Sequence, residues 1–400
     1  MIRRDEYLNQ LIKFKDKEII KVVTGIRRCG KSTLFELYID YLLEYGVEQE
    51  QIIMLNLEDL EYDFIDDAKK LHDYIARKLQ MGKMNYIFID EVQRVPEFQK
   101  AVDSLFIKKN CDVYITGSNA YLLSSELATL LSGRYVEIKM LPLSFQEYIS
   151  VYPDIENLEK LYLNYTVNSS FPYAINFTAK KELKMYLDGI IDSILLKDVI
   201  TRGKFPDIEM LKSVLKFGFD NIGNMVSINK IANTMISAGR KIAPNTVESY
   251  MTALTNSFIF YDVKRYDIKG KQYLKTGSKY YVADIGLRYA LLGSKPADDG
   301  HILENVVYLE LLRRGYEVYI GKVGNVEVDF VAINDMGIEY YQVAYTVREE
   351  NTLNRELGAL DMIKDHNPKY LLTMDQTPYT SHNGIKQINA LEWLLYKDIK

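Results

Sequence analysis

The stretch Gly25-Ile26-Arg27-Arg28-Cys29-Gly30-Lys31-Ser32 decides the expected fold, because it matches the phosphate-binding pattern G-x-x-x-x-G-K-[ST] at every defined position. The apolar, β-branched run at 19–24 predicts a buried strand before it. The pattern at 33–45 predicts a helix after it, which ends before Gly46. Strand, glycine loop and helix in this order predict a loop that holds a phosphate group, rather than a chance match on a surface turn.

The residue types of this loop suit a triphosphate ligand. Gly25 and Gly30 lack the Cβ atom that would keep the main chain away from a phosphate, and the N–H groups at the start of a helix favour an anion. We expect Lys31 to reach the β- and γ-phosphates of ATP, and Ser32 to bind Mg²⁺. The predicted nucleotide-binding residues are Gly25, Arg28, Cys29, Gly30, Lys31, Ser32 and Thr33.

A second motif lies at 86–91, Tyr-Ile-Phe-Ile-Asp-Glu, where two acids directly follow four apolar residues. It resembles a Walker B strand, whose acids emerge at the carboxyl end of a buried parallel strand. We expect Asp90 to bind Mg²⁺, directly or through water, and Glu91 to orient or deprotonate the attacking water. An isolated Asp-Glu pair fits a solvated turn equally well, and the upstream loop favours the functional interpretation.

A third apolar run, at 112–116, ends in Gly117-Ser118-Asn119. In ATPases with an extra strand between the two motifs, this strand end carries a polar residue that senses the γ-phosphate. Asn119 or Ser118 fits that role, and Asn119 is included among the predicted catalytic residues. The alternative is an ordinary Gly-Ser-Asn turn.

The composition limits the class of protein. Four hundred residues, 48% of them hydrophobic, predict two to three globular domains. No apolar stretch approaches the roughly 20 residues of a membrane-spanning helix, and the charged start of the chain does not resemble a secretory signal. Two cysteines and four histidines, without ligand spacing, argue against a disulfide scaffold and a structural zinc site. We therefore expect a cytoplasmic protein with no membrane partner.

Residues 1–150 alternate apolar strands with helical patterns, which predicts an α/β fold: a parallel sheet covered by helices on both faces. With the motifs above, this domain resembles a P-loop NTPase of the ASCE or AAA type. The rest predicts a helical linker or lid at 151–205 and a winged helix at 206–295. Between 225 and 280, nine Lys or Arg oppose three acids in a chain of net charge −5. This excess indicates a DNA or RNA surface, although winged helices also act as protein-contact modules.

Residues 296–400 resemble the PD-(D/E)xK nuclease core, an α/β restriction-endonuclease-like domain with a helical Glu, a hairpin Asp and a following strand. Glu304, Asp329 and Gln342 take the three metal-binding positions of that core. Active members carry a lysine two residues after the third position, where it helps to activate water. This chain has Ala344 there. We therefore expect a vestigial site without efficient phosphodiester cleavage, unless another lysine enters it.

Taken together, the chain resembles a large prokaryotic family of AAA-type ATP-binding proteins with a C-terminal domain of unknown function. The resemblance rests on 7–8, 21–33, 88–93, 116–119, 132–135, 142–145 and 328–331. It implies ATP binding and hydrolysis, and relatedness to signalling ATPases that act as nucleotide-controlled switches. It also implies a catalytic role for Arg134, which follows Gly133 where related ATPases place an arginine on the γ-phosphate. Such an arginine acts within its own chain or across a subunit interface, and the alternative is a surface ion pair.

We therefore expect a Mg²⁺-dependent ATPase that acts as a conformational switch coupled to the winged helix and the nuclease-like tail. One alternative is a module that ATP stabilises for binding a protein or a nucleic acid, with negligible turnover. A second is a nuclease gated by ATP. The protein partner stays open, and so does assembly into a nucleotide-dependent oligomer.

Overall fold

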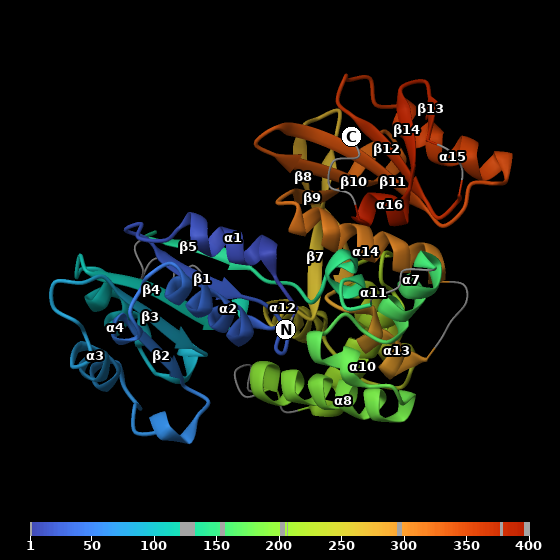
Figure 1. The fold of residues 1–400 in the computed structure, drawn as a ribbon. Coiled ribbons are helices and arrows are strands. Elements are labelled where there is room, and N and C mark those ends of the chain that lie inside the picture. Colours follow the sequence, from blue (N-terminus) through green and yellow to red (C-terminus); the bar gives the residue numbers. More distant parts are fainter. Residues whose placement is uncertain are drawn as a thin grey trace. The chain divides into compact units, whose positions relative to one another are not determined.

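The computed structural model describes residues 2–120, 133–152, 157–200, 205, 207–293, 298–376 and 379–395. The chain folds into two compact units (Figure 1). The N-terminal unit comprises residues 1–142 with 256–258, and the C-terminal unit comprises 143–255 with 259–400. The first boundary therefore falls between Pro142 and Leu143.

A five-stranded sheet of parallel strands forms the centre of the N-terminal unit, in the order β2-β3-β4-β1-β5. The strands are β1 (Ile20–Thr24), β2 (Ile52–Asn56), β3 (Asn85–Asp90), β4 (Cys111–Gly117) and β5 (Tyr135–Lys139). Strand β4 lies between β1 and β3, so it separates the strand before the glycine loop from the strand that ends at Asp90. This confirms the predicted parallel sheet, including the extra strand between the two motifs.

Helices cover both faces of this sheet. They are α1 (Asp5–Lys13), α2 (Lys31–Glu44), α3 (Ala68–Ala76) and α4 (Phe98–Phe106). Apolar side chains of α3 and α4, among them Leu71 and Val102, pack in one core with Val22. On α2, Tyr38 stacks edge-on against Phe88 with ring centroids 6.0 Å apart, so α2 covers the other face. Strands β1 and β3 are buried along their whole length, which fits their mainly apolar and β-branched composition.

A buried ion pair lies beneath α2. Lys21 of β1 donates a hydrogen bond to Asp112, and both side chains are almost fully buried. Asp112 also accepts hydrogen bonds from the Asp16 main-chain N–H, at 2.9 Å, and from the Tyr114 hydroxyl, at 2.7 Å. Burial lowers the pKa of Lys21 and raises the pKa of Asp112, and their mutual attraction opposes both shifts. Each partner therefore offsets part of the cost of burying the other.

A nine-stranded sheet forms the centre of the C-terminal unit, in the order β13-β14-β12-β11-β10-β9-β7-β8-β6. Its strands are β6 (Met225–Val226), β7 (Phe260–Asp267), β8 (Gln272–Val282), β9 (Glu317–Val323), β10 (Val326–Asn334), β11 (Gly337–Ala344), β12 (Lys369–Thr373), β13 (Thr380–His382) and β14 (Ile385–Asn389). The β7–β8 hairpin belongs to the predicted winged helix, and β9 to β14 belong to the predicted nuclease-like domain. Parallel pairing of β7 with β9 joins these two regions into one sheet.

The helices of the C-terminal unit include those of the predicted lid and winged helix. They are α6 (Phe145–Ile149), α7 (Leu158–Val167), α8 (Lys180–Ser193), α10 (Ile208–Asp220), α11 (Ile228–Ser237), α12 (Pro244–Asn256), α13 (Ile285–Leu292), α14 (Asp299–Arg313), α15 (Glu350–Asp361) and α16 (Ala390–Leu395). A π-helical segment, Ile194–Ile200, follows α8. Ser144 and Glu147 form a capping box at the start of α6. The names winged helix and nuclease-like domain stay predictions.

We expect Lys21→Met to lower the free energy of unfolding by about 3 kcal/mol, because it leaves the Asp112 carboxylate buried without its counter-charge. The double variant K21M/D112N should recover a large part of this loss. Lys100→Met is the matched control, since Lys100 pairs with Glu97 on the surface and such pairs contribute about 1 kcal/mol at most. Urea-induced unfolding of the full chain measures all three. Equal losses for K21M and K100M would contradict the assigned role of the pair.

Candidate functional site

The glycine loop leaves the carboxyl end of β1 and enters α2, and its two glycines have positive φ angles. Gly25 has a φ of 153°, and a Cβ atom there would lie 2.1 Å from the Met140 carbonyl oxygen. Gly30 has a φ of 104° and caps the N-terminus of α2. Residues with a side chain rarely adopt these backbone angles. The local structure therefore requires glycine at both positions, independently of any ligand.

Lys31 folds back over this loop. Its Nζ donates hydrogen bonds to the carbonyl oxygens of Gly25, at 3.0 Å, and Ile26, at 3.3 Å. Its Nζ also lies 4.0 Å from Glu91 Oε1, and the residue is only 5% exposed. The ammonium group is thus held against the main chain that the motif assigns to phosphate binding.

Ser32 and Asp90 meet at the carboxyl edge of the sheet. Ser32 Oγ donates to Asp90 Oδ2 at 2.5 Å, and the Thr116 hydroxyl donates to Asp90 Oδ1. Burial raises the pKa of the Asp90 carboxyl, while the hydrogen bonds from Ser32 and Thr116 oppose that rise. A hydroxyl and a carboxylate oxygen at one point are ligands of the type that Mg²⁺ prefers. These two residues therefore fit the ion that the motif implies.

Glu91 follows Asp90 in a left-handed backbone conformation, with φ of 53°. This conformation is uncommon for a residue with a side chain and marks a locally constrained turn. The Glu91 N–H donates to Thr116 Oγ1 at 2.9 Å, and its carboxylate accepts from Ser118 Oγ at 3.2 Å and from the Gln93 amide. Polar side chains from the ends of β3 and β4 thus hold Glu91 beside Lys31.

The other predicted residues of this site are placed as follows. Asn119 is buried, at 3% exposure, directly beyond the end of β4. The contact to Glu91 comes from Ser118, the alternative in the same tripeptide. Cys29 is buried, Thr33 is half-buried on α2, and Arg28 is exposed with a φ of 70°.

Arg134 is not brought together with these residues. It lies immediately before β5, and its carbonyl oxygen accepts from the Ile20 N–H, at 2.9 Å, where β1 begins. The guanidinium carbon lies 5.8 Å from the centroid of the Phe106 ring. Arg134 is thus at the amino edge of the parallel sheet, whereas the glycine loop is at the carboxyl edge. Within its own chain it does not reach the loop.

Three residues that support the site are not among the predicted site residues. Arg4 is 2% exposed and donates to the carbonyl oxygens of Cys29, at 2.9 Å, and Leu141, at 2.7 Å. Thr116 and Gln93 fix the two acids, as described above. Thr116 and Gln93 lie in the segments 116–119 and 88–93, which carry the family resemblance, so the sequence offered a signal for both. Arg4 is distant in sequence, and only its unusual burial identifies it.

In the C-terminal unit, the structure brings Glu304, Asp329 and Gln342 together. The Asp329 N–H donates to Gln342 Oε1 at 3.2 Å, and Lys279 Nζ lies between Glu304 and Asp329, 2.8 Å and 3.8 Å from their carboxylate oxygens. Within the described ranges, no group of three or more His, Cys, Asp or Glu has a geometry that could hold a metal ion. None of the helices in the described part is long and apolar enough to cross a membrane.

The fold and the loop geometry define an AAA-type P-loop NTPase fold in the N-terminal unit. Residues 17–149 match the family model described as an AAA domain, and residues 159–298 match one described as a domain of unknown function, DUF8612. The Walker-type ATPase PABY2304 of Pyrococcus abyssi has a similar structure, with a TM-score of 0.50 and 18% identity over 73% of this chain and 96% of that chain. At that identity the likeness shows the fold alone.

Two full-length relatives show the family. An uncharacterized protein of Haemophilus influenzae is 44% identical over 99% of this chain and 99% of its own length. The uncharacterized protein MJ1544 of Methanocaldococcus jannaschii is 32% identical over 86% of this chain and 79% of its own length. This chain belongs to the family that contains these two proteins, and its AAA domain occupies the N-terminal part.

We expect Gly25→Ala to lower the free energy of unfolding by about 2 kcal/mol or more, because the new Cβ meets the Met140 carbonyl oxygen. Gly46→Ala is the matched control: Gly46 also has a positive φ, of 86°, but nothing lies within 4 Å of its Cβ position. Its cost should stay near 1 kcal/mol, from backbone strain alone. Thermal and urea unfolding of both variants provide the measurement, and a Gly25→Ala chain as stable as Gly46→Ala would contradict this loop geometry.

Proposed function

We propose that the N-terminal unit binds ATP with Mg²⁺ and hydrolyses the terminal phosphate. The observation that carries this proposal is the contact of 2.5 Å between Ser32 Oγ and Asp90 Oδ2. It joins the end of the glycine loop to the acid at the end of β3, two segments 58 residues apart. In support, Lys31 and Ser118 both contact the carboxylate of Glu91, the residue that follows Asp90.

The proposed roles follow from the positions of these groups. The main-chain N–H groups of the loop and the first turn of α2 would bind the phosphates, together with Lys31. Ser32 and Asp90 would hold Mg²⁺, which supplies charge neutralisation of the phosphate oxygens. Glu91 would accept a proton from, or orient, the attacking water, and Ser118 and Gln93 hold its carboxylate. Asn119, at the end of β4, would sense the γ-phosphate.

We propose further that Arg134 acts across a subunit interface. In support, Arg134 lies at the amino edge of the sheet, away from its own glycine loop, so a γ-phosphate contact would be to the loop of a second copy. A guanidinium group on the γ-phosphate would stabilise the charge that develops during hydrolysis. The protein would then form a nucleotide-dependent oligomer.

The C-terminal unit would respond to the nucleotide as the output of a switch. We propose duplex DNA or RNA as its partner, because Lys230, Arg240, Lys241, Lys264, Lys269 and Lys271 are exposed. Exposed cations of this kind give sequence-independent binding to a phosphate backbone. Lys279 belongs to the same basic region in sequence but is buried, so it does not contribute.

We expect Lys31→Ala to abolish ATP binding and Glu91→Gln to keep it while losing at least about 100-fold in turnover, because a general base contributes 10²–10⁴-fold. Calorimetry with ATP and Mg²⁺ measures binding. Phosphate release, with and without duplex DNA, measures turnover. Glu97→Gln is the control, since Glu97 pairs with Lys100 on the surface. Equal ATPase rates for Glu91→Gln and the unmodified protein would contradict the assignment of the base. Binding without turnover in the unmodified protein would favour the ATP-stabilised binding module.

We expect Arg134→Ala and Lys31→Ala each to lack ATPase activity alone and to recover part of it when mixed. In a mixed oligomer, the loop of one subunit and the arginine of the other are both intact at some interfaces. Phosphate release at increasing proportions of the second variant gives the measurement. Full activity of Arg134→Ala alone, or no recovery on mixing, would contradict the role across the interface.

A further inference from the structure

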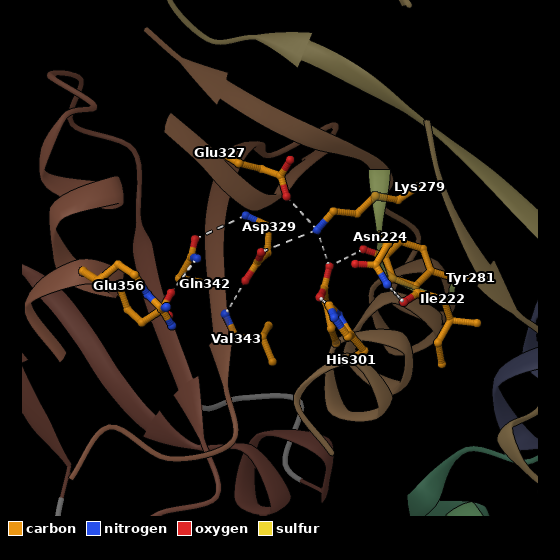
Figure 2. Close-up of polar contacts among 12 residues, drawn as sticks. Ile222, Asn224, Lys279, Tyr281, His301, Glu327, Asp329, Gln342, Val343 and Glu356 are labelled. Atoms are coloured by element: carbon orange, nitrogen blue, oxygen red, sulfur yellow. Dashed lines mark hydrogen bonds and ion pairs between the residues drawn. The ribbon is translucent and has the colours of Figure 1, made fainter. Parts of the chain in front are cut away.

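Lys279 occupies the middle of the acidic cluster in the C-terminal unit, as Figure 2 shows. Its Nζ lies 2.8 Å from Glu304 Oε1, 2.7 Å from Glu327 Oε1 and 3.8 Å from Asp329 Oδ1. Glu304 comes from α14, and Glu327 and Asp329 come from β10. Lys279 comes from β8, the second strand of the hairpin, and is only 4% exposed. One ammonium group therefore forms ion pairs with carboxylates from two different elements.

Further hydrogen bonds hold Glu304, Asp329 and Gln342 within the protein. Glu304 Oε1 accepts from the Tyr281 hydroxyl at 2.5 Å, and Asp329 Oδ2 accepts from the Val343 N–H at 2.9 Å. Gln342 Oε1 accepts from the Asp329 N–H, and its Nε2 donates to Glu356 Oε2 at 2.7 Å. The oxygen that would be the third metal ligand is thus turned to the main chain.

A divalent metal does not fit this arrangement. Mg²⁺ demands near-octahedral oxygen coordination, whereas the oxygens here converge on a hydrogen-bond donor that already carries the positive charge. Burial alone would lower the pKa of Lys279, but the carboxylates of Glu304, Asp329 and Glu327 raise it well above its ordinary value. Lys279 in turn holds the pKa of Glu304 below its ordinary range, against the effect of burial. The pair is therefore charged under physiological conditions.

We propose that Lys279 is the resident cation of the Glu304–Glu327–Asp329 cluster, in the position where a nuclease of this arrangement would bind its metal. The lysine then ties the β7–β8 hairpin to α14 and β10, and the C-terminal unit performs no metal-dependent phosphodiester cleavage. A lysine does enter the site, as the sequence left open, but it replaces the metal instead of assisting it. This proposal is independent of ATP binding by the N-terminal unit.

Mn²⁺ binding to the nucleotide-free full chain tests the proposal, with electron paramagnetic resonance as the readout. The unmodified protein and Asp329→Asn should bind the same amount of Mn²⁺, since the cluster has no metal site to lose. Lys279→Met should gain one Mn²⁺ site, at least tenfold tighter than any in the unmodified protein. The double variant K279M/D329N should lose it again. Lys264→Met removes a charge from the exposed face of the same hairpin, where Lys264 pairs with Asp262, and should gain nothing.

A second measurement keeps the test decisive if Lys279→Met folds poorly. Lys279→Met and Glu304→Gln should each lower the thermal midpoint, and the double variant should lower it by clearly less than the sum, because the two residues form one pair. Additive losses would overturn the tie. The metal assignment is overturned if the unmodified protein binds Mn²⁺ at a site that Asp329→Asn removes, or if it cleaves DNA with Mn²⁺ in an Asp329-dependent manner.

Discussion

Convergence of three strand ends at one edge of a parallel sheet is the constraint on which the N-terminal unit depends. Strands β1, β4 and β3 are adjacent and point the same way, so whatever follows each of them emerges at the same edge. The glycine loop follows β1, Ser118 follows β4, and Asp90 and Glu91 end β3. Hydrogen bonds then connect the three ends directly, from Ser32 to Asp90 and from Ser118 to Glu91.

Short-range patterns predicted this unit well. The run at 86–91 is both a motif and a strand, and the run at 19–24 leads directly into the glycine loop. The same short segments therefore indicate the functional residues and the strands that position them. The same reasoning has no access to pairs of residues that fold together from distant positions. Lys21 interrupts the apolar run at 19–24, and nothing near it in the sequence indicates its partner Asp112, which is 91 residues away. Two arginines show the same limit. Arg4 supports the glycine loop although no motif includes it, and Arg134, which the resemblance assigned to the γ-phosphate, lies at the opposite edge of the sheet.

The C-terminal unit shows why boundaries were harder to predict than elements. Helices and strands from 206 to 400 follow local periodicity, but nothing local indicates that β7 pairs with β9 across more than 50 residues. That pairing merges two predicted domains into one sheet and carries Lys279 to Glu304 and Asp329. The nuclease-like motif places its lysine at position 344, which is alanine in this chain. The lysine that contacts Glu304 and Asp329 is Lys279 of β8, which the sheet topology brings to them.

Arg4 links the glycine loop to the segment where the chain leaves the N-terminal unit. The same guanidinium group contacts the carbonyls of Cys29 and Leu141, and the Cβ position of Gly25 abuts the Met140 carbonyl. The Leu141 N–H donates to the Tyr7 hydroxyl at 3.1 Å, and the unit ends one residue later, at Pro142. The Arg4 side chain therefore holds both the loop and the exit segment. Substitution of Arg4 would therefore remove a contact of the loop and a contact of the exit segment at the same time.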